Sequence, residues 1–389
     1  MMDRSQLCDP DAIKQLARQE ARRLGAADVR VAQACDDEQA RDAMRASFAR
    51  GDFATWPYDE GYAQKAASPQ HVLPGAQSVI CVAVPYRTNA PDAGPLEGRV
   101  SNYAWSADYH HRVKALLRAV ADRIDEAAGE HVTAIACDTK PLAERAFAAR
   151  AGLGWVGKHT NLISPIAGSF IFLGEIVTTL RLPADPPLRK TCGSCTRCIP
   201  ACPTGALRAD YTIDATRCIA DLTQRTDPIP REMRPFIGTW VWGCDLCQLA
   251  CPPNARASVV AGDANVPVSR DTSTPSLVKL LRLRSGEFKR TYQRTAMGWR
   301  GAAILRRNAA VALGNLLDRA AVPALIEALR EDPHSLVRGH AGWALGRIGS
   351  PPAIQALRDR LTLEQDGSVR KELREALEPF RATPALQTV

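Results

Sequence analysis

Residues 191–203 read TCGSCTRCIPACP, and the spacing of the cysteines in this stretch decides the fold of the middle of the chain. Cys192, Cys195 and Cys198 are each separated by two residues, and Cys202 stands directly before a proline. Three thiolates at this spacing wrap three corners of an iron–sulfur cubane, whereas zinc ligands ordinarily come as two separated pairs. The stretch therefore favours a [4Fe–4S] cluster, with structural zinc as the alternative.

A second set of cysteines lies downstream, at Cys218 and in the run Cys244-x2-Cys247-x3-Cys251, which again ends before a proline. The first stretch matches the bacterial ferredoxin run, and in two-cluster ferredoxins the cysteine before proline ligates the other cluster. The sequence therefore predicts a ferredoxin-like module with two [4Fe–4S] clusters, which implies one-electron transport and a group to reduce. The expected ligands are Cys192, Cys195, Cys198 and Cys251 for cluster 1, and Cys202, Cys218, Cys244 and Cys247 for cluster 2.

The remaining composition places the protein among soluble globular chains. Its 389 residues suffice for two or three compact domains. The first residues are charged and lack the apolar segment of a secretory signal, and no apolar stretch is long enough to span a membrane. We therefore expect a cytoplasmic protein with reduced thiols and no membrane partner. The isolated cysteines are expected to be small buried hydrophobic residues: Cys8, Cys35, Cys81 and Cys137.

The region before the cysteines alternates between strand and helix patterns. Its apolar runs and helical spacings predict an α/β domain, with a mixed sheet and helices on both faces. The expected strands are 29–32, 78–85, 131–137 and 170–179, and the expected helices are 12–24, 109–128 and 139–151.

The C-terminal region contains an internal repeat. Residues 305–314, 337–346 and 369–377 align with a spacing of 32 residues both times, and a partner helix recurs between them. Each unit is then a helix pair whose apolar face needs its neighbour, a pattern that resembles HEAT-like repeats. Chance similarity in an Ala- and Leu-rich helical region is the alternative.

Basic residues are concentrated just before and within the first repeat. Between Lys279 and Arg307 there are nine Lys and Arg residues and one acid, and this segment accounts for the whole net charge of +8. Such clustering is typical of a polyanion site, although a solvated helix face is the alternative. Phe288, Tyr292 and Trp299 lie between the bases and are expected to stack on nucleic acid bases.

Two composition changes divide the chain. A Pro-rich stretch at 183–190 and a polar stretch near 267–274 predict three domains: an α/β catalytic domain at 1–182, a double [4Fe–4S] domain at 183–266, and the basic segment with all-α repeats at 267–389.

Asp138 is the candidate catalytic acid of the first domain. It directly follows the strand expected at 131–137, and carboxyl ends of strands are where open α/β sheets build sites. A helix is expected to open with Thr139 as N-cap and Pro141 in its first turn, so the alternative is that Asp138 only caps this helix. The glycines of 152–157 spell G-x-G-x-x-G, but without the strand before and helix after that a dinucleotide site needs.

The combination of motifs resembles the epoxyqueuosine reductase family. It rests on CDTKPLAER at 137–145, GWVGKHTN at 154–161, the split double-ferredoxin set and the terminal repeats, and it covers most of the chain. The resemblance implies a cobalamin-dependent iron–sulfur oxidoreductase of tRNA processing. Its reaction would remove the epoxide oxygen of epoxyqueuosine at the wobble position, the last step of queuosine biosynthesis. Cobalamin rests on the resemblance alone.

The resemblance also implies roles for individual residues and partners. Asp138 matches the family's proton donor and Arg145 a substrate contact. The residues expected beside cobalamin are Asp138, Lys158 and the segment residues Ser101, Tyr103, Asp108, Tyr109 and His110. The alternative for that segment is a buried Tyr/His helix start. Residues 52–70 fit the family poorly and supply no expected ligand. The expected partners are tRNA with a GUN anticodon and an external donor of the reduced flavodoxin or ferredoxin type, for a monomeric protein. The expected tRNA contacts are Arg282, Arg284, Lys289, Arg290, Arg294, Trp299 and Arg300.

The expected chemistry needs a proton source. An epoxide is a poor leaving group unless its oxygen is protonated as the C–O bond breaks, so we expect burial against the corrin face to raise the pKa of Asp138 toward neutrality. The alternatives are a reductive dehalogenase of a small organohalide, or a ferredoxin-like electron carrier or RNA-binding scaffold without a reaction of its own. The sequence does not reveal the physiological donor, the tRNA preference, or whether cobalamin acts as nucleophile or electron donor.

Overall fold

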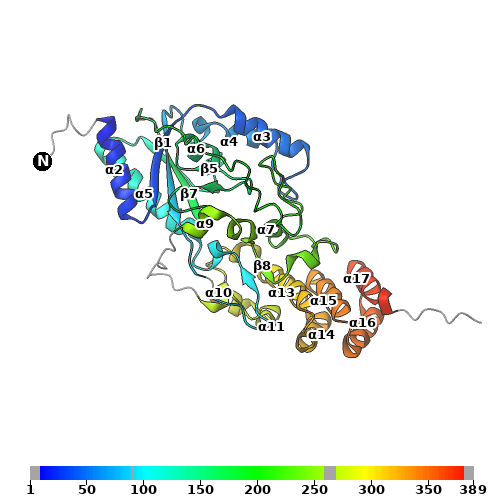
Figure 1. Ribbon diagram of the computed structural model, residues 1–389. Coiled ribbons are helices and arrows are strands. Elements are labelled where there is room, and N and C mark those ends of the chain that lie inside the picture. The colour runs from blue at the N-terminus through cyan, green and yellow to red at the C-terminus, as the bar shows by residue number, and fades with distance from the viewer. Residues whose placement is uncertain (1–8, 90, 258–268, 381–389) are drawn as a thin grey trace, which may run out of the picture. The chain divides into compact units, whose positions relative to one another are not determined.

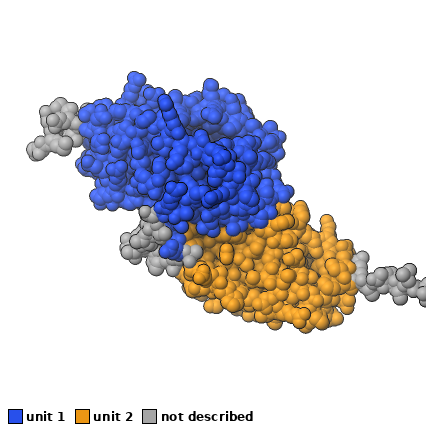
Figure 2. All heavy atoms as spheres, in the orientation of Figure 1, with its two compact units in different colours: residues 1–89, 108–218, 245–267 blue, residues 90–107, 219–244, 268–389 orange. Residues whose placement is uncertain are grey.

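The computed structural model describes residues 9–89, 91–257 and 269–380 (Figure 1). The chain forms two compact units, each built from separate stretches of sequence (Figure 2). Unit 1 comprises residues 1–89, 108–218 and 245–267, and unit 2 comprises residues 90–107, 219–244 and 268–389. The chain therefore leaves and re-enters each unit, and the domain limits at 182 and 266 stay predictions. Cys8 lies outside the described residues.

The core of unit 1 is a four-stranded sheet with the order β1-β2-β7-β4. Its strands are β1 (Asp28–Gln33), β2 (Ser78–Pro85), β4 (Thr133–Ala136) and β7 (Ile171–Thr178). All three pairings are antiparallel, so the expected mixed sheet is wrong in strand direction. The runs are buried on both faces, and an apolar run of this kind predicts a strand without predicting its direction.

Helices cover both faces of this sheet, as the sequence predicted. Alternate residues of β2 explain why: Ile80 and Val82 pack in one apolar cluster with α2 and α5, and Val79 and Cys81 pack in another with α6. The helices are α2 (Pro10–Arg23), α5 (Tyr109–Ala128) and α6 (Glu144–Arg150), with α3 (Glu38–Ala49) and α4 (Glu60–Ala66) between β1 and β2.

The isolated cysteines behave differently from one another. Cys81 and Cys137 are buried, as expected, but Cys35 is exposed in the loop after β1, where its thiol lies 2.6 Å from the Arg150 guanidinium.

A small hairpin carries residues 154–161. It pairs β5 (Trp155–Val156) with β6 (Leu162–Ile163) in antiparallel register, so no helix follows the glycines of 152–157. Gly152 and Gly154 precede the hairpin, and Gly157 lies in its loop. A Cβ on Gly154 would lie 2.5 Å from the Ile163 carbonyl oxygen, so Gly154 serves close packing. Two short helices complete the described part of unit 1, α8 (Leu246–Leu249) and α9 (Pro252–Arg256).

Unit 2 consists of a short parallel sheet and a helical repeat array. The sheet pairs β3 (Arg99–Val100) with β8 (Trp240–Trp242). The short helices are α7 (Ile219–Leu222), α10 (Arg270–Ser273), α11 (Leu277–Leu281) and α12 (Ser285–Thr291). The array consists of α13 (Ala302–Leu316), α14 (Val322–Glu331), α15 (Ser335–Ile348), α16 (Pro351–Leu363) and α17 (Gly367–Leu377).

The three aligned sequence segments are the helices α13, α15 and α17, and consecutive members pack against each other, which confirms the repeat. The repeated Ala-Leu-Gly has a steric reason. A Cβ on Gly314 would lie 2.7 Å from Trp343, and a Cβ on Gly346 would lie 2.8 Å from Ala376. These glycines let neighbouring helices approach closely. Within the described residues, no helix is both long and apolar enough to cross a membrane.

Candidate active site and cluster ligands

Asp138 lies in a tight turn just after β4. Its backbone adopts a φ of 56°, a left-handed conformation that is uncommon for a residue other than glycine. Helix α6 begins only at Glu144, so the helix expected from Thr139 is wrong for its first residues. The left-handed backbone at Asp138 and the proline at 141 do not continue a helix. Ala143 is the N-cap of α6, so Asp138 does not cap it.

Two hydrogen bonds hold the Asp138 turn. The Glu144 carboxylate accepts the backbone N–H of Asp138, and His110 Nε2 lies 3.0 Å from Asp138 Oδ2. His110 is in turn fixed by Asp108, the N-cap of α5, whose Oδ1 lies 2.7 Å from His110 Nδ1. His110 thus bridges two carboxylates.

This bridge sets the protonation states. Hydrogen bonds to Asp108 and Asp138 raise the pKa of His110 to about 9, so the imidazole is protonated at neutral pH. The hydrogen bond from His110 lowers the pKa of Asp138, although burial opposes it, and the Tyr109 side chain adds a further hydrogen bond. In the protein alone the pKa of Asp138 is therefore lowered, and the proton of the pair resides on His110. The raised pKa expected from burial against a corrin face stays a prediction.

A cavity of about 300 Å³ in unit 1 opens beside Asp138. One side of it is an aromatic stack, in which the Phe172 ring lies 4.3 Å from Tyr86 and 4.2 Å from Tyr109, centroid to centroid. The cavity thus combines flat apolar faces with a few polar groups, as sites for small ligands do. It is lined by Tyr86, Tyr109, Asp138, Glu144, Arg145, Asn161, Leu162, Ser169, Ile171, Phe172, Leu173 and Gln248.

The structure brings together some of the expected site residues and not others. Asp138, Tyr109 and Arg145 share the cavity, and Arg145 Nη1 donates to the Thr160 carbonyl at 2.8 Å. Lys158 is elsewhere in unit 1, where its Nζ donates to the Gly193 carbonyl at 2.9 Å, among the cluster cysteines. Ser101 belongs to unit 2 and packs there against Gly243.

Sequence reasoning missed several site residues and contacts. The resemblance places His110 beside the cofactor, but its contact with Asp138 and that of Glu144 with the Asp138 backbone come only from the fold. Tyr58 and Tyr62 come from the segment 52–70, and their ring centroids are 4.2 Å apart. Burial raises the pKa of Tyr62 to about 12, and the charges of Glu144 and Asp138 add to this effect, which places Tyr62 beside the site. The density of aromatic residues between 53 and 62 was the available signal.

The four cysteines expected to hold cluster 1 are grouped in unit 1. Burial raises the pKa of Cys251 to about 12, and the nearby thiols of Cys192, Cys198 and Cys195 contribute. Cys251 and Cys192 also pack against Trp155 and Ile163 of the hairpin. Thiolates this close together repel one another, which disfavours their ionisation. Positively charged iron offsets this repulsion, and the thiolate is the form that binds metal, so the grouping suits an iron cluster.

Three of the four cysteines expected for cluster 2 are grouped in the same way. Burial raises the pKa of Cys247 well above its usual range. The nearby charges of Cys218, Asp245 and Cys202 raise it further. The fourth, Cys244, belongs to unit 2. All cysteines among the described residues are free thiols, and no three potential ligands there lie close enough for a single metal ion.

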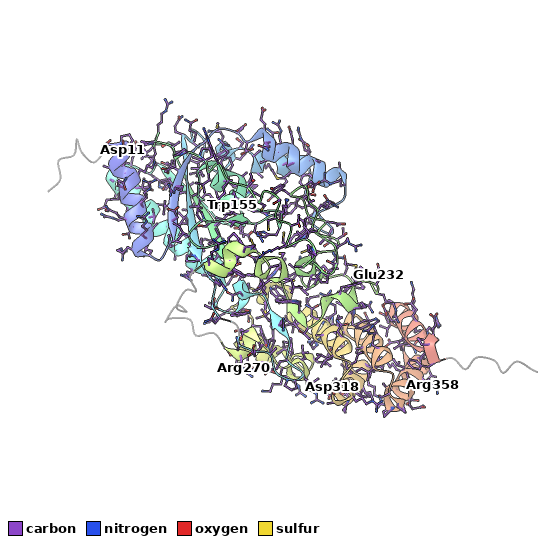
Figure 3. The ribbon with its side chains drawn as sticks, viewed as in Figure 1. Asp11, Trp155, Glu232, Arg270, Asp318 and Arg358 are labelled. Atoms are coloured by element: carbon purple, nitrogen blue, oxygen red, sulfur yellow. The ribbon has the colours of Figure 1, made fainter. Side chains whose placement is uncertain are left out.

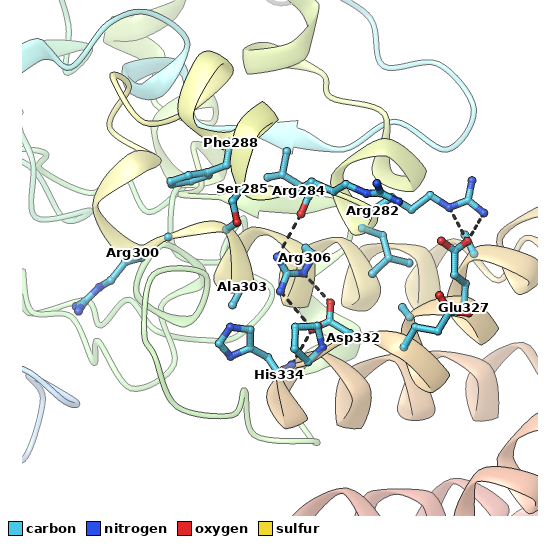
Figure 4. A pocket seen from close by; sticks show the side chains of 18 of the residues that line it. Arg282, Arg284, Ser285, Phe288, Arg300, Ala303, Arg306, Glu327, Asp332 and His334 are labelled. Carbon is cyan, nitrogen blue, oxygen red and sulfur yellow. Dashed lines mark hydrogen bonds and ion pairs between the residues drawn. The ribbon is translucent and has the colours of Figure 1, made fainter.

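The basic segment borders a groove of about 730 Å³ in unit 2, where α11 and α12 face α13 and α14 (Figure 4). Arg282, Arg284, Lys289 and Arg300 line it, whereas Arg290, Arg294 and Trp299 are not among its lining residues. Trp299 is 53% exposed, and the Arg300 guanidinium stacks 3.7 Å from its ring centroid.

Some members of the basic segment have structural roles. Arg307 is fully buried and donates to carbonyls of residues 222–227, and Arg306 pairs with Asp332 at 2.6 Å. Arg282 pairs with Glu327 at the groove (Figure 4). Tyr292 is also buried and donates to the Asp271 carbonyl, so its expected stacking on nucleic acid bases is wrong.

The fold and the grouped cysteines define an iron–sulfur oxidoreductase with a helical repeat array. Residues 191–254 match the family described as 4Fe-4S double cluster binding domain, residues 301–378 match HEAT repeats, and residues 67–139 match Epoxyqueuosine reductase QueG, DUF1730. The epoxyqueuosine reductase of Bacillus cereus is 36% identical over 82% of this chain and 86% of its own length. The chain belongs to the epoxyqueuosine reductase family.

Solved structures agree with this membership. A crystal structure of epoxyqueuosine reductase with an epoxyqueuosine-modified tRNA-Tyr stem loop is 31% identical, with a TM-score of 0.90 over 96% of this chain and 100% of that chain. The Bacillus subtilis enzyme, 29% identical with a TM-score of 0.87 over 95% of this chain and 99% of that chain, was solved with its catalytic aspartate loop swung out of the active site.

Proposed function

We propose that this protein reduces epoxyqueuosine to queuosine at the wobble position of tRNAs with a GUN anticodon, in the cytoplasm. The observation that carries the proposal is that unit 1 combines the Asp138–His110 pair with the grouped cluster cysteines, in a chain that aligns with the Bacillus cereus reductase over 82% of its length. Loss of the epoxide oxygen as water takes two electrons and two protons. One site must therefore receive electrons and deliver protons at the same C–O bond. We propose a monomer and an external one-electron donor of the flavodoxin or ferredoxin type.

The clusters supply one-electron transfer when they are bound. Cluster 1 is held by Cys192, Cys195, Cys198 and Cys251, and cluster 2 by Cys202, Cys218, Cys244 and Cys247. Lys158 supports cluster 1 electrostatically, since its charge favours the thiolate of Cys198.

Two orphaned polar atoms in the 154–161 hairpin fit a large polar cofactor such as cobalamin. Trp155 Nε1 and His159 Nε2 are buried without a hydrogen-bond partner among the described residues. Trp155, which is labelled in Figure 3, belongs to β5. Burial lowers the pKa of His159 to about 4, so its imidazole is neutral. Buried polar groups need partners, which the amide side chains around a corrin ring can provide. Tyr109, Asp138, Lys158 and Ser101 are further proposed contacts.

When bound, cobalamin supplies the reducing centre for the epoxide carbon. The residues of this chain handle the proton. His110 holds the proton and passes it to Asp138 through the 3.0 Å contact between Nε2 and Oδ2, and Asp138 delivers it to the oxygen as the C–O bond breaks. His110 then takes up a proton from solvent and supplies the second proton by the same route. Asp108 orients the imidazole, so that Nε2 faces Asp138. The loop that carries Asp138 moves out of the cavity and back into it during turnover. The swung-out catalytic loop of the Bacillus subtilis relative supports this movement.

The substrate is held by charge and by the cavity. Arg145 reaches the modified base from the cavity wall, and the groove bases Arg284, Lys289 and Arg300 contact RNA phosphates. Arg282, Arg290 and Arg294 add to the positive field, and the exposed ring of Trp299 stacks on an unpaired base.

The test is conversion of epoxyqueuosine-containing tRNA by reconstituted Asp138→Asn protein, followed by mass analysis of the nucleosides. We expect conversion to fall by about 10²–10⁴-fold, because general acid catalysis is lost, while the visible spectra of the clusters and the bound cofactor are unchanged. Asp122→Asn, at an exposed position of α5, is the matched control and should convert normally. Near wild-type conversion by Asp138→Asn would exclude Asp138 as the proton donor.

A further inference from the structure

Glu175 is a fully buried glutamate in the middle of the unit 1 sheet. It lies on β7, opposite Cys81 of β2 and Ala136 of β4, with 0% of its surface exposed. Alternation along β7 places it on the same face as Val177, the face that α6 covers with an apolar cluster. An ionised carboxylate is very unfavourable in such a place unless it is paired.

Neither carboxyl oxygen of Glu175 meets a hydrogen-bond donor in the part of the chain that the structure describes. The side chain that it does engage is the carboxyl of Glu144, at the start of α6. Two carboxylates are both acceptors, so this contact becomes a hydrogen bond only when one of them carries a proton. Glu175 is the deeper of the two and is cut off from water.

Glu144 links this contact to the catalytic loop. The carboxylate of Glu144 accepts the backbone N–H of Asp138, the residue whose left-handed backbone, with φ of 56°, needs support from its surroundings. The contacts therefore run from the sheet interior, through Glu175 and Glu144, to the backbone of Asp138.

We propose that Glu175 is a neutral carboxylic acid that donates its O–H to Glu144 and thereby holds the Asp138 loop in the cavity. Glu175 is then a positioning residue for proton delivery, and its effect on turnover rests on the proposed function of Asp138. The pair keeps one shared proton, so that Glu144 retains an ionised oxygen for the Asp138 N–H.

The surrounding charges support this assignment. Burial raises the pKa of Glu175 well above its ordinary value, with the Glu144 charge adding to it, and burial raises the pKa of Glu144 to about 7. The other titratable groups around the pair include Tyr62 on α4, Cys81 from β2, Cys137 and Asp138 after β4, and Arg145 on α6. Of these, only Arg145 is a cation, and its charge favours ionisation of Glu144 rather than of the deeper Glu175.

The first test is the infrared spectrum of the full-length protein at neutral pH. We expect wild type to show the C=O stretching band of a protonated carboxylic acid, shielded from deuterium exchange, and Glu175→Gln to lack it. Glu130→Gln, at an exposed position, is the matched control and should keep the band. A spectrum of wild type without the band, or a band that persists in Glu175→Gln, would overturn the proposal.

The second test measures whether the pair holds the loop, by hydrogen–deuterium exchange of the segment 137–143. The amide of Glu175→Gln can replace the O–H donor, whereas Glu175→Leu cannot. We therefore expect exchange close to wild type in Glu175→Gln and faster by about tenfold or more in Glu175→Leu, as for loss of a hydrogen bond to a charged group. Equal protection in the two variants would contradict the positioning role.

These readouts separate the two proposals. Neither measurement depends on catalysis. The protonation of Glu175 and its stabilisation of the loop can therefore be confirmed or contradicted even if Asp138→Asn proves active. Should Glu175→Leu fail to fold, the infrared comparison of wild type with Glu175→Gln still decides where the proton lies.

Discussion

At Asp138, the hydrogen bond from His110 is the largest cause of the lowered pKa. The sequence placed this carboxyl correctly at the end of a strand, but the sign of its pKa shift came from His110, which lies 28 residues earlier in the chain. Glu144 and Glu175 were missed for the same reason, since β7 and α6 meet only in the fold. Local sequence predicts which residues sit at a strand end; it does not predict which distant groups face them.

The His110 imidazolium gives the reaction a pH limit. Its pKa is raised from 6.5 to about 9, so the proton source is intact at neutral pH and is lost as the pH rises through about 9. We expect single-turnover rates of pre-reduced protein to fall on the alkaline side near this value. In His110→Gln, the rate should be about 10²–10⁴-fold lower at neutral pH. The exposed His131→Gln is the control, and an unchanged alkaline limb in His110→Gln would contradict the role of His110.

At the scale of elements, the sequence was most accurate where a pattern repeats or a cap is explicit. Helix α5 has the bounds expected, because Asp108 caps its start and Gly129, with φ of 75°, ends it. The 32-residue repeat predicted α13, α15 and α17. The start of α6 was misplaced, because the turn at Asp138 is stabilised by Glu144 and not by local propensity.

The repeat glycines should be sensitive to the smallest substitution. In Gly314→Ala, the added Cβ would lie 2.7 Å from Trp343 and 2.9 Å from the Ala344 backbone, so α13 and α15 must move apart. We expect a loss of about 1–3 kcal/mol in the free energy of unfolding, measured by urea denaturation. Gly339→Ala is the matched control on α15, where the nearest atom is at 3.6 Å. It should be neutral or stabilising by up to about 1 kcal/mol. Equal losses in both variants would show that helix spacing is not the cause.

The groove in unit 2 should bind RNA through phosphates. Because each neutralised phosphate releases counterions, we expect Arg284→Ala and Lys289→Ala each to weaken tRNA binding and to reduce the slope of log K against log salt by about 1. Filter binding at several salt concentrations measures both quantities. Arg374→Ala, an exposed arginine on α17, is the control. If it changed the slope as much as the groove variants do, the groove would not be the RNA site.

At the scale of the whole molecule, the cysteines proposed as cluster ligands come from both units, with Cys244 in unit 2 and the others in unit 1. The spacing rules predicted the grouping of the thiols, since ferredoxin-type runs are short and local. The spacing rules could not predict that residues 219–244, which follow Cys218, belong to unit 2. That assignment depends on contacts of the segment with β3 and the repeat array.

The iron content of purified protein tests the ligand sets. We expect about eight iron atoms per chain in wild type and about four in either Cys198→Ala or Cys247→Ala, because each variant removes one ligand from one cluster. The exposed Cys35→Ala is the control and should retain full iron. Loss of all iron in both single variants would indicate that the clusters do not assemble independently, whereas full iron in either would exclude that cysteine as a ligand.

The discontinuous units also constrain how the protein can be made. Residues 90–107 leave the ribosome long before their partners in unit 2 are synthesised. The Trp105 carbonyl accepts a hydrogen bond from the Thr272 hydroxyl, and β3 pairs with β8, so both contacts form only after the later segments emerge. Unit 1 likewise stays open until residues 245–257 arrive with two of its cysteines. Neither unit can complete its fold from a nascent N-terminal fragment. Folding and cluster insertion therefore come late in synthesis or after it. A cut at residue 182 would separate segments of both units, and a cut at 266 would separate segments of unit 2. Co-expression of the complementary pieces is the natural way to recover them.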